Sequence, residues 1–556
     1  MPHLLSHKTS STSSKKSSNR KKISYNRSSQ KKENEKLAKK ARVKKHKKNF
    51  FRANNEKRAK QEQCKFDNTE NKTGSKRNQY VTQNNVENFF TNQGMSKKIG
   101  KKAREFGFVK HENKFAPAKF IQSILVAVGS GGEPESLSKI NELFNMKYGG
   151  KMQNKPFWNR LSSAPCVDLM GYTMEQAKES HNAASERCPY SEGEELIGCI
   201  NRHGLDVEDI EVYDGTYWKL KSELSDEYPG ARTILKKEKV NNTYTEAGDE
   251  VYDEVGNSGI GLQTIMSLKT GSLIKVAVTA ETANEKEFVS VSKEHRILAL
   301  MDNGYFKLKL LEHIMEEGSY FITKGRKNCA AVISDCKIWG TQQNGNPLAE
   351  EYNGIKVSDA LTKLRKYKQN IEFIGTFKEE LAVRMVAFYS KDKNDVVLLV
   401  TNIKNNILSA KLITDIYRVR WQTELLYKNL KSGNSLRFSK HTSNKNILMV
   451  LIMASLCAFF LKNLVANFLS QMLKDISFFK IHVGSSWFND YIGALFKWDF
   501  EQIRTMLREM LKKFTFFTKS KQSKKKNLEH RTLRSILDDI AQSYMASTFE
   551  DCELLD

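Results

Sequence analysis

The sequence lacks the signals of secreted, membrane-spanning and P-loop proteins. Its eight cysteines include no C-x-x-C pair and no nearby histidine cluster, so we expect free thiols in a reducing compartment and no zinc site. Only two leucines precede the first lysines, which argues against a signal-peptide core. The longest apolar run, 447–461, is shorter than the roughly 20 residues of a membrane crossing and predicts a buried core helix. No Gly-Lys-Ser or Gly-Lys-Thr follows the glycines at 129–132, which excludes a P-loop there.

Acidic residues are scarce relative to basic ones. The formal net charge is +27, and residues 1–60 hold 21 Lys or Arg against 3 Asp or Glu, a net +18 that leaves +9 for the remainder. This split indicates a polyanionic partner, with nucleic acid favoured over a membrane surface. Residues 1–95 lack apolar periodicity and predict a basic disordered tail that adds salt-sensitive attraction to phosphates.

Helical periodicity begins after this tail. Over 96–200, Ser136 or Ser138 is a candidate N-cap, Gly149 a helix stop, and Pro156 suits the first turn of the next helix. Two short helices with a tight turn fit a helix-turn-helix DNA reader, and they fit a small helical bundle equally well. We predict a helical DNA-binding region.

From residue 209 the pattern becomes α/β. DIEVYDGTYWKL predicts a strand that ends at Asp214, LQTIMSL and LIKVAVTAE predict a hairpin, and EKEFVSVSKEH predicts a short helix. RILALMD then predicts a strand that ends at Asp302, followed by an amphipathic helix, FKLKLLEHIMEEG, and a strand, SYFITKG. The first part of an α/β core is therefore assigned to 201–325.

Four short alternating strands around a small helix, VSDALTKLRKY, predict a β-rich insertion over 326–404. Two helices at 405–474 return to the core pattern. Residues 475–556 are expected to be a helical C-terminal region, where the apolar spacing of FEQIRTMLREMLKKF suits a helix that packs on a partner.

The basic segment DIYRVRWQTELLYKNLKSG at 415–433 carries a carboxylate, Glu424, in the middle of its positive face. On a regular helix it shares one face with five other side chains: Tyr417, Arg420, Trp421, Lys428 and Lys431. A solvent-facing helix would make Glu424 an ordinary counter-charge. The aromatic residues and the arginine instead favour a DNA backbone gripped beside a carboxylate-bound metal.

A single carboxylate cannot hold two divalent ions, so this hypothesis requires partners. Asp214 and Asp302, in VYDGTYW and LMDNGYF, each follow an apolar strand at the position from which a sheet presents side chains to a cleft. Taken alone, either is more often a turn residue. Asp335, in VISDCKIW, competes as the second acid; we prefer Asp302 because an amphipathic helix follows it and because Asp335 lies within the insertion.

These residues resemble the Tyr-Arg-Glu-Lys signature of the bacterial insertion-sequence-4 family of DDE transposases. The spacing is Tyr417, two residues, Arg420, three residues, Glu424, six residues and Lys431. DGT and DNGYF resemble the family's first and second acidic motifs, in the expected order, and the resemblance spans 200–470.

The resemblance implies a ribonuclease H-like catalytic core, interrupted by a β-strand insertion, in an α/β protein with helical N-terminal and C-terminal regions. It implies that Asp214, Asp302 and Glu424 coordinate two Mg²⁺ ions, for which Mn²⁺ can substitute. Their carboxyl groups have reference pKa values near 4, so we expect them to be ionised at neutral pH.

The resemblance further implies that Tyr417, Arg420 and Lys431 contact phosphates near the cleaved transposon end. Asn303 departs from the pattern, since many relatives carry Arg there. The implied function is a transposase that binds terminal inverted repeats, cleaves double-stranded DNA at their ends and joins them to target DNA as a synaptic homodimer. The implied location is cytoplasmic, bacterial and nucleoid-associated, without a membrane.

Two other interpretations stay open. A non-catalytic, DNA-binding or domesticated descendant of a transposase would keep the acids without cleaving DNA. A basic RNA- or ribosome-associated structural protein would account for the lysine-rich tail and leave the acids unexplained. Short inverted repeats flanking the gene would favour an active element over a remnant.

Overall fold

A computed structural model of the protein describes the following residues: 81–90, 95–110, 115–130, 136–187, 191–231, 234–237, 252–255, 258–340, 344–378, 381–391, 394–472, 476–483 and 485–513, with Phe516 and Leu537. The chain divides into Met1–Gln79 and Tyr80–Asp556, and only the second unit contains described residues. The predicted tail therefore lies outside the described residues as far as residue 80. Residues 81–90 are ordered into α2 (Gln83–Phe89), because Val86 and Phe89 are buried.

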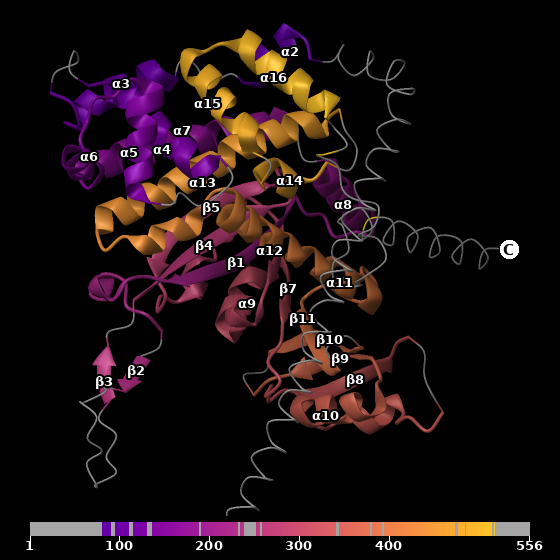
Figure 1. The fold of residues 1–556 in the computed structure, drawn as a ribbon. Helices are drawn as coiled ribbons and strands as arrows, with labels where there is room; N and C mark the ends of the chain where they lie inside the picture. Colours follow the sequence, from indigo (N-terminus) through magenta and orange to yellow (C-terminus); the bar gives the residue numbers. More distant parts are fainter. Residues whose placement is uncertain are drawn as a thin grey trace, which may run out of the picture. The chain divides into compact units, whose positions relative to one another are not determined.

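A nine-stranded sheet runs through the described residues, with β4 and β5 next to α13 and with β8 to β10 beside α10 (Figure 1). Its order is β5-β4-β1-β6-β7-β11-β10-β9-β8. The strands are β1 (Asp209–Lys219), β4 (Gly259–Ser267), β5 (Ser272–Ala280), β6 (Ile297–Met301), β7 (Tyr320–Lys324), β8 (Val332–Ile338), β9 (Ile371–Thr376), β10 (Ala382–Ser390) and β11 (Asp395–Thr401). β6 pairs in parallel with β1 and with β7. The other neighbouring pairs are antiparallel, and a separate ladder joins β2 (Ile234–Lys237) to β3 (Tyr252–Val255).

The structure confirms the hairpin β4–β5, the strands β6 and β7, and the amphipathic helix α9 (Leu308–Glu316) between them. The helix predicted at EKEFVSVSKEH is wrong, because the structure has only a 3₁₀ turn there, Glu285–Phe288. The predicted end of the first strand at Asp214 is wrong. β1 runs on to Lys219 because β4 continues to supply backbone partners, with Asp214 opposite Thr264 and Lys219 opposite Gly259.

The strands and helix predicted within 326–404 are present as β8 to β11 and α10 (Val357–Tyr367). They extend the central sheet, because β11 pairs with β7. Arg384 of β10 also donates to the carbonyl oxygens of Ile403 and Leu408 and pairs with Glu372 at 2.7 Å. These strands are thereby joined to the loop that leads into α11 (Ala410–Tyr417).

The two faces of the sheet belong to different hydrophobic clusters, because successive side chains of a strand point to opposite faces. Ile210 and Val212 of β1 pack in a cluster with α13 (Lys445–Ser470), whereas Tyr213 packs with Met301 in a second cluster. Asp214 has the same parity as Val212. It therefore projects from the face that carries α13 and its neighbouring helices.

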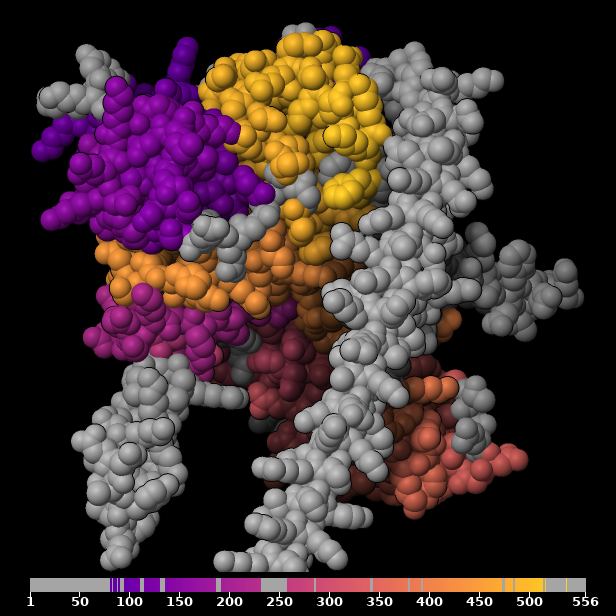
Figure 2. All heavy atoms as spheres, in the orientation of Figure 1, coloured from indigo at the N-terminus to yellow at the C-terminus, as the bar shows by residue number. Residues whose placement is uncertain are grey.

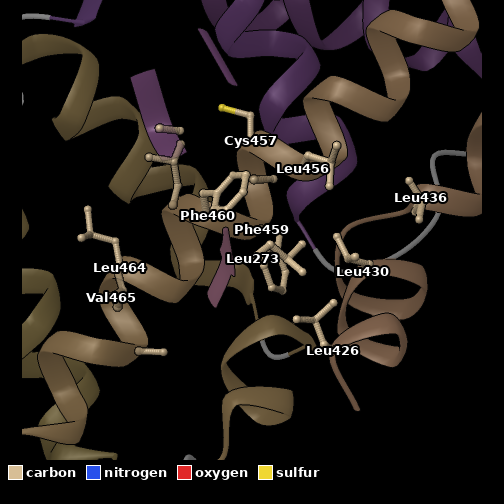
Figure 3. Packing of buried hydrophobic residues seen from close by; sticks show 14 of the residues in the cluster. Leu273, Leu426, Leu430, Leu436, Leu456, Cys457, Phe459, Phe460, Leu464 and Val465 are labelled. Atoms are coloured by element: carbon tan, nitrogen blue, oxygen red, sulfur yellow. The ribbon is translucent and has the colours of Figure 1, made fainter. Parts of the chain in front are cut away.

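The helix α13 confirms the predicted core helix, although its 26 residues exceed the predicted apolar run. Among the described residues it is long and apolar enough to cross a membrane, but 89% of its most apolar window is buried within the fold. Phe459 lies beside Leu273 of β5 and faces Leu426 and Leu430 (Figure 3). The apolar side chains are thus used by the core of the protein.

The remaining described helices are α3 (Met95–Glu105), α4 (Pro117–Gly129), α5 (Leu137–Tyr148), α6 (Asn154–Leu161), α7 (Ala164–Arg187), α8 (Ser191–Arg202), α12 (Trp421–Lys428), α14 (Phe478–Val483), α15 (Phe488–Lys497) and α16 (Phe500–Lys512). Ser136 precedes α5, Gly149 ends it in the left-handed region with φ 67°, and Pro156 lies in the first turn of α6, as predicted. α13 packs on α4 and α7 (Figure 1).

The C-terminal helices pack on the N-terminal ones within this chain, with α15 and α16 in yellow against the purple N-terminal helices in Figure 2. The apolar side chains of α16 are buried, among them Ile503, Leu507 and Leu511. Arg508 also donates to the carbonyl oxygen of Val81 at 3.2 Å. The apolar face that suggested a dimer contact is therefore covered by the chain itself, and that basis for the prediction is wrong.

Candidate active site

The first two predicted acids lie side by side at the end of a parallel strand pair. The pairing of β1 with β6 ends at Tyr213 opposite Met301, and Asp214 and Asp302 are the next residues of the two strands. Because the two strands are parallel and in register, Asp214, within β1, lies beside Asp302, which directly follows the end of β6. The adjacency that the sequence could only suggest is thus a consequence of strand register.

The predicted helix at 415–433 is irregular. α11 ends at Tyr417, a 3₁₀ turn spans Arg418–Arg420, α12 follows, and a π-helical turn covers Asn429–Gly433. Side chains therefore leave the single face that a regular helix would give. Lys428 lies one turn after Glu424 in α12, is exposed, and has its ammonium 4.4 Å from the centre of the Phe479 ring.

One guanidinium joins the first and third predicted acids. Nη1 of Arg420 donates to Oδ2 of Asp214 at 3.0 Å, and Nη2 donates to Oε1 of Glu424 at 3.2 Å. The side chains of Arg420 and Asp214 are each 17% exposed and that of Glu424 is 38% exposed. Glu424 is therefore more than a solvent counter-charge, because it is held across a partly buried ion pair from Asp214.

Asp214 has two further partners. Its Oδ1 accepts from the backbone N–H of Gly215 at 2.9 Å, and its Oδ2 accepts from the Thr423 hydroxyl at 2.9 Å. The sequence reasoning missed Thr423. The sequence offered one signal, a hydroxyl side chain directly before Glu424. The structure shows that this side chain is fully buried, and a buried hydroxyl needs a hydrogen-bond partner.

Two other signature residues also face β1 and β6. The Tyr417 hydroxyl donates to the carbonyl oxygen of Met301 at 3.2 Å, directly before Asp302. The Lys431 ammonium donates to the hydroxyl of Thr216, and it lies 5.9 Å from the Tyr427 ring centre. The structure therefore brings Tyr417, Arg420, Glu424 and Lys431 together with the aspartates.

Burial and like charge raise the pKa of two of these carboxyl groups. Burial is the main cause for Asp214, where Arg420, Thr423 and the N–H of Gly215 act in the opposite direction and the nearby Asp302 carboxylate adds to the increase. Burial is also the main cause of the raised pKa of Glu424, opposed by Arg420 and reinforced by the two aspartates. The three acids thus share one electrostatic environment.

The pKa of the Lys431 ammonium is lowered, mainly by burial and further by Arg437, while Asp214 acts in the opposite direction. Among the described residues, no three His, Cys, Asp or Glu side chains lie close enough together to hold a metal ion. In this arrangement Arg420 supplies the positive charge between Asp214 and Glu424.

The competing acid, Asp335, lies far along the sheet from this site. It belongs to β8, the edge strand at the opposite end of the order from β5, and five strands separate β8 from β1. Its side chain is 67% exposed and is 3.9 Å from Lys337. The five cysteines that the structure describes are free and buried, in agreement with the prediction of free thiols.

Comparison with known proteins identifies similarity over the same segment. Residues 208–460 match the family model described as a transposase DDE domain, and this range contains the three candidate acids. The chain is 21% identical over 492 residues to the transposase for insertion sequence element IS1151 of Clostridium perfringens, covering 81% of this chain and 95% of that protein. It is 20% identical over 367 residues to the transposase for insertion sequence element IS231D of Bacillus thuringiensis subsp. finitimus, covering 60% and 70%. These similarities support a DDE transposase.

Proposed function

We propose that this protein, similar to insertion-sequence transposases, binds the terminal inverted repeats of its element, cleaves phosphodiester bonds at their ends and transfers the strands into target DNA. The match to a transposase DDE domain supports the reaction class, and the spacing Tyr417, Arg420, Glu424 and Lys431 supports membership of the insertion-sequence-4 family. The proposed partner is double-stranded DNA. Synapsis by a homodimer would have to use a surface other than the buried face of α16.

The proposed catalytic residues and metal ligands are Asp214, Asp302 and Glu424. Three carboxylates supply only oxygen ligands, the type that Mg²⁺ and Mn²⁺ prefer, and burial among like charges favours a bound cation. When bound, two such ions activate the attacking oxygen and stabilise the leaving oxygen of an in-line displacement. A DDE domain generally implies divalent metal use.

In this proposal Arg420 has two successive roles. Without metal, its guanidinium holds Asp214 and Glu424, which would otherwise repel each other across a partly buried site. When DNA and metal arrive, the guanidinium turns to a phosphate near the cleaved end, because its fork of donors suits phosphate as well as carboxylate. Lys431 and Tyr417 are proposed to contact the same backbone.

The sheet supports a ribonuclease H-like core. The strands β5, β4 and β1 pair with one another in antiparallel fashion, and β6 and β7 then follow in parallel with β1. The observation that carries the proposal is the convergence of Asp214, within β1, and Asp302, directly after the neighbouring strand β6, with the helix that presents Glu424. Residues distant in sequence supply one acidic site within the matched domain.

The proposal is tested by strand cleavage of a labelled duplex that carries the gene's own flanking ends, with Mg²⁺ or Mn²⁺. Glu424→Gln keeps the side-chain shape and removes its charge, so we expect it to bind the duplex and to lose cleavage by at least about a hundredfold. Glu316→Gln on α9 is the matched control, because that side chain is exposed, and it should cleave like wild type.

The outcome separates the two leading functions. Cleavage at the repeat boundary by wild type, lost in Glu424→Gln, supports the transposase. Binding without cleavage by both proteins under either metal would leave a DNA-binding remnant, in which the pairing of Arg420 with Asp214 and Glu424 is permanent.

A further inference from the structure

Thr423 contacts a proposed metal ligand without being one itself. It lies in the first turn of α12, next to Glu424, and its side chain is fully buried. Its hydroxyl oxygen is 2.9 Å from Oδ2 of Asp214 and 2.8 Å from the carbonyl oxygen of Arg420. A hydroxyl has one hydrogen to donate, and the charged carboxylate is the stronger acceptor. Thr423 therefore directs its hydrogen bond to Asp214.

The other side-chain donor to Asp214, Arg420, also donates to a second carboxylate. Arg420 shares its guanidinium between Asp214 and Glu424 at 3.0 and 3.2 Å, and a long side chain can turn away by rotating several bonds. Thr423 is β-branched, which restricts the rotation of its side chain, and its hydroxyl is only two bonds from the backbone of α12. It stays in place when Arg420 turns to a phosphate.

The two donors also differ in charge. A guanidinium neutralises Asp214 and so competes with a cation for it, whereas a hydroxyl orients the carboxylate and leaves its negative charge available. The bond also links β1 to the first turn of α12, at the residue adjacent to Glu424. Thr423 thereby sets the position of the first acid relative to the third.

We propose that Thr423 is a positioning residue, which holds the Asp214 carboxylate in the orientation that binds a divalent metal once Arg420 has withdrawn. The inference rests on the proposed function, since it concerns the metal site of that function. It adds a residue that lies outside the Tyr-Arg-Glu-Lys spacing.

The test is the binding of Mn²⁺ alone to the full chain, measured from the loss of the free Mn²⁺ signal in electron paramagnetic resonance. Thr423→Val keeps the branched shape and removes the hydroxyl, so we expect Mn²⁺ affinity to fall roughly 10- to 100-fold. Thr423→Ser keeps the hydroxyl and should restore the affinity of wild type. Raised Mn²⁺ should also restore DNA cleavage by Thr423→Val, which a general folding defect would not allow.

Asp214→Asn separates the two hypotheses. If Asp214→Asn leaves Mn²⁺ binding unchanged, both the proposed metal site and the proposed role of Thr423 are wrong. If it abolishes binding while Thr423→Val binds as tightly as wild type, only the role of Thr423 is overturned. Should Thr423→Val fail to fold, Thr423→Cys, with a weak donor, must bind Mn²⁺ less tightly than Thr423→Ser; equal affinity would overturn the inference.

Discussion

At the scale of single residues, the sign and burial of neighbouring charges decide what each acid can do. Asp214 and Glu424 lie on either side of one guanidinium and within the field of Asp302. Asp335 has the same side chain and also follows apolar residues, but it is exposed on an edge strand. Their positions in the fold therefore separate these aspartates.

This separation predicts opposite outcomes for two alanine substitutions. Asp302→Ala removes a side chain of the acidic site and should abolish DNA cleavage, whereas Asp335→Ala should retain most of it. Cleavage of the end-carrying duplex at fixed protein and metal concentration compares the two. The reverse result would mean that the second acid has been assigned to the wrong strand.

A second prediction concerns the buried Glu211 on β1. Burial raises the pKa of its carboxyl group from 4.5 to about 7, while a hydrogen bond from the Tyr213 hydroxyl at 2.5 Å acts in the opposite direction. The folded state then holds a proton that the unfolded state releases near pH 4.5. The stability contributed by this group is therefore present at low pH and is lost as pH rises through about 4.5 to 7.

Glu211→Gln removes this titration. Between pH 4.5 and 7.5, the unfolding free energy of wild type should fall relative to that of the variant by up to about 3 kcal/mol. Urea unfolding at several pH values measures the difference. Parallel pH profiles for the two proteins would show that Glu211 does not titrate in this range.

At the scale of elements, the π-helical turn Asn429–Gly433 depends on buried polar groups of α13 and α14. The ammonium of the fully buried Lys462 donates to the carbonyl oxygens of Gly433 and His482 at 2.8 and 2.9 Å. His482 also bonds to Asn463 at 2.9 Å. These bonds fix the segment that presents Lys431 to β1.

Gly433→Ala should therefore destabilise the fold. A Cβ atom at Gly433 would lie 2.8 Å from Cβ and 2.9 Å from the carbonyl oxygen of His482, which is itself held by Lys462. We expect a loss of roughly 1–3 kcal/mol in unfolding free energy. Gly493→Ala on α15 is the control: no atom lies within 4 Å of its added Cβ, and a helical alanine should be neutral or stabilising by about 0.5–1 kcal/mol. Equal stability of the two variants would contradict the packing argument.

At the scale of the whole molecule, charge is divided unevenly between the basic N-terminal segment and the folded unit. Residues 1–60 carry a net +18, and the described fold begins with Val81 and α2, which pack on α16. A deletion intended to remove only the charged segment should therefore stop at residue 79. A deletion that continued through α2 would also remove Phe89 and Phe90. It would expose the rings that they contact, Phe468 and Tyr491.

Deleting 1–79 should weaken binding to duplex DNA and reduce the slope of log affinity against log salt, because fewer phosphate counterions are released. The cleavage site should not move. Binding titrations at several salt concentrations, with mapping of the cut ends, measure both quantities. A shifted site would show that the segment reads sequence, and an unchanged salt slope would show that it does not contact DNA.

The sequence by itself determined most of the local elements and the chemical types of the site residues. Apolar segments predicted β4 to β7, and helical spacing predicted α9 and α13. The motifs around Asp214, Asp302 and Glu424 identified the candidate acids. These features depend on residues near one another in the chain, where side-chain periodicity is a sufficient guide.

Only the tertiary structure decided which of these residues meet. Strand register places Asp214 beside Asp302, and the packing of α14 places the Phe479 ring against the Lys428 ammonium. The bond from Thr423 to Asp214 joins residues 209 positions apart. Such contacts depend on long-range pairing and packing, for which a local pattern holds no information, because any strand or helix of the same periodicity could have occupied either place.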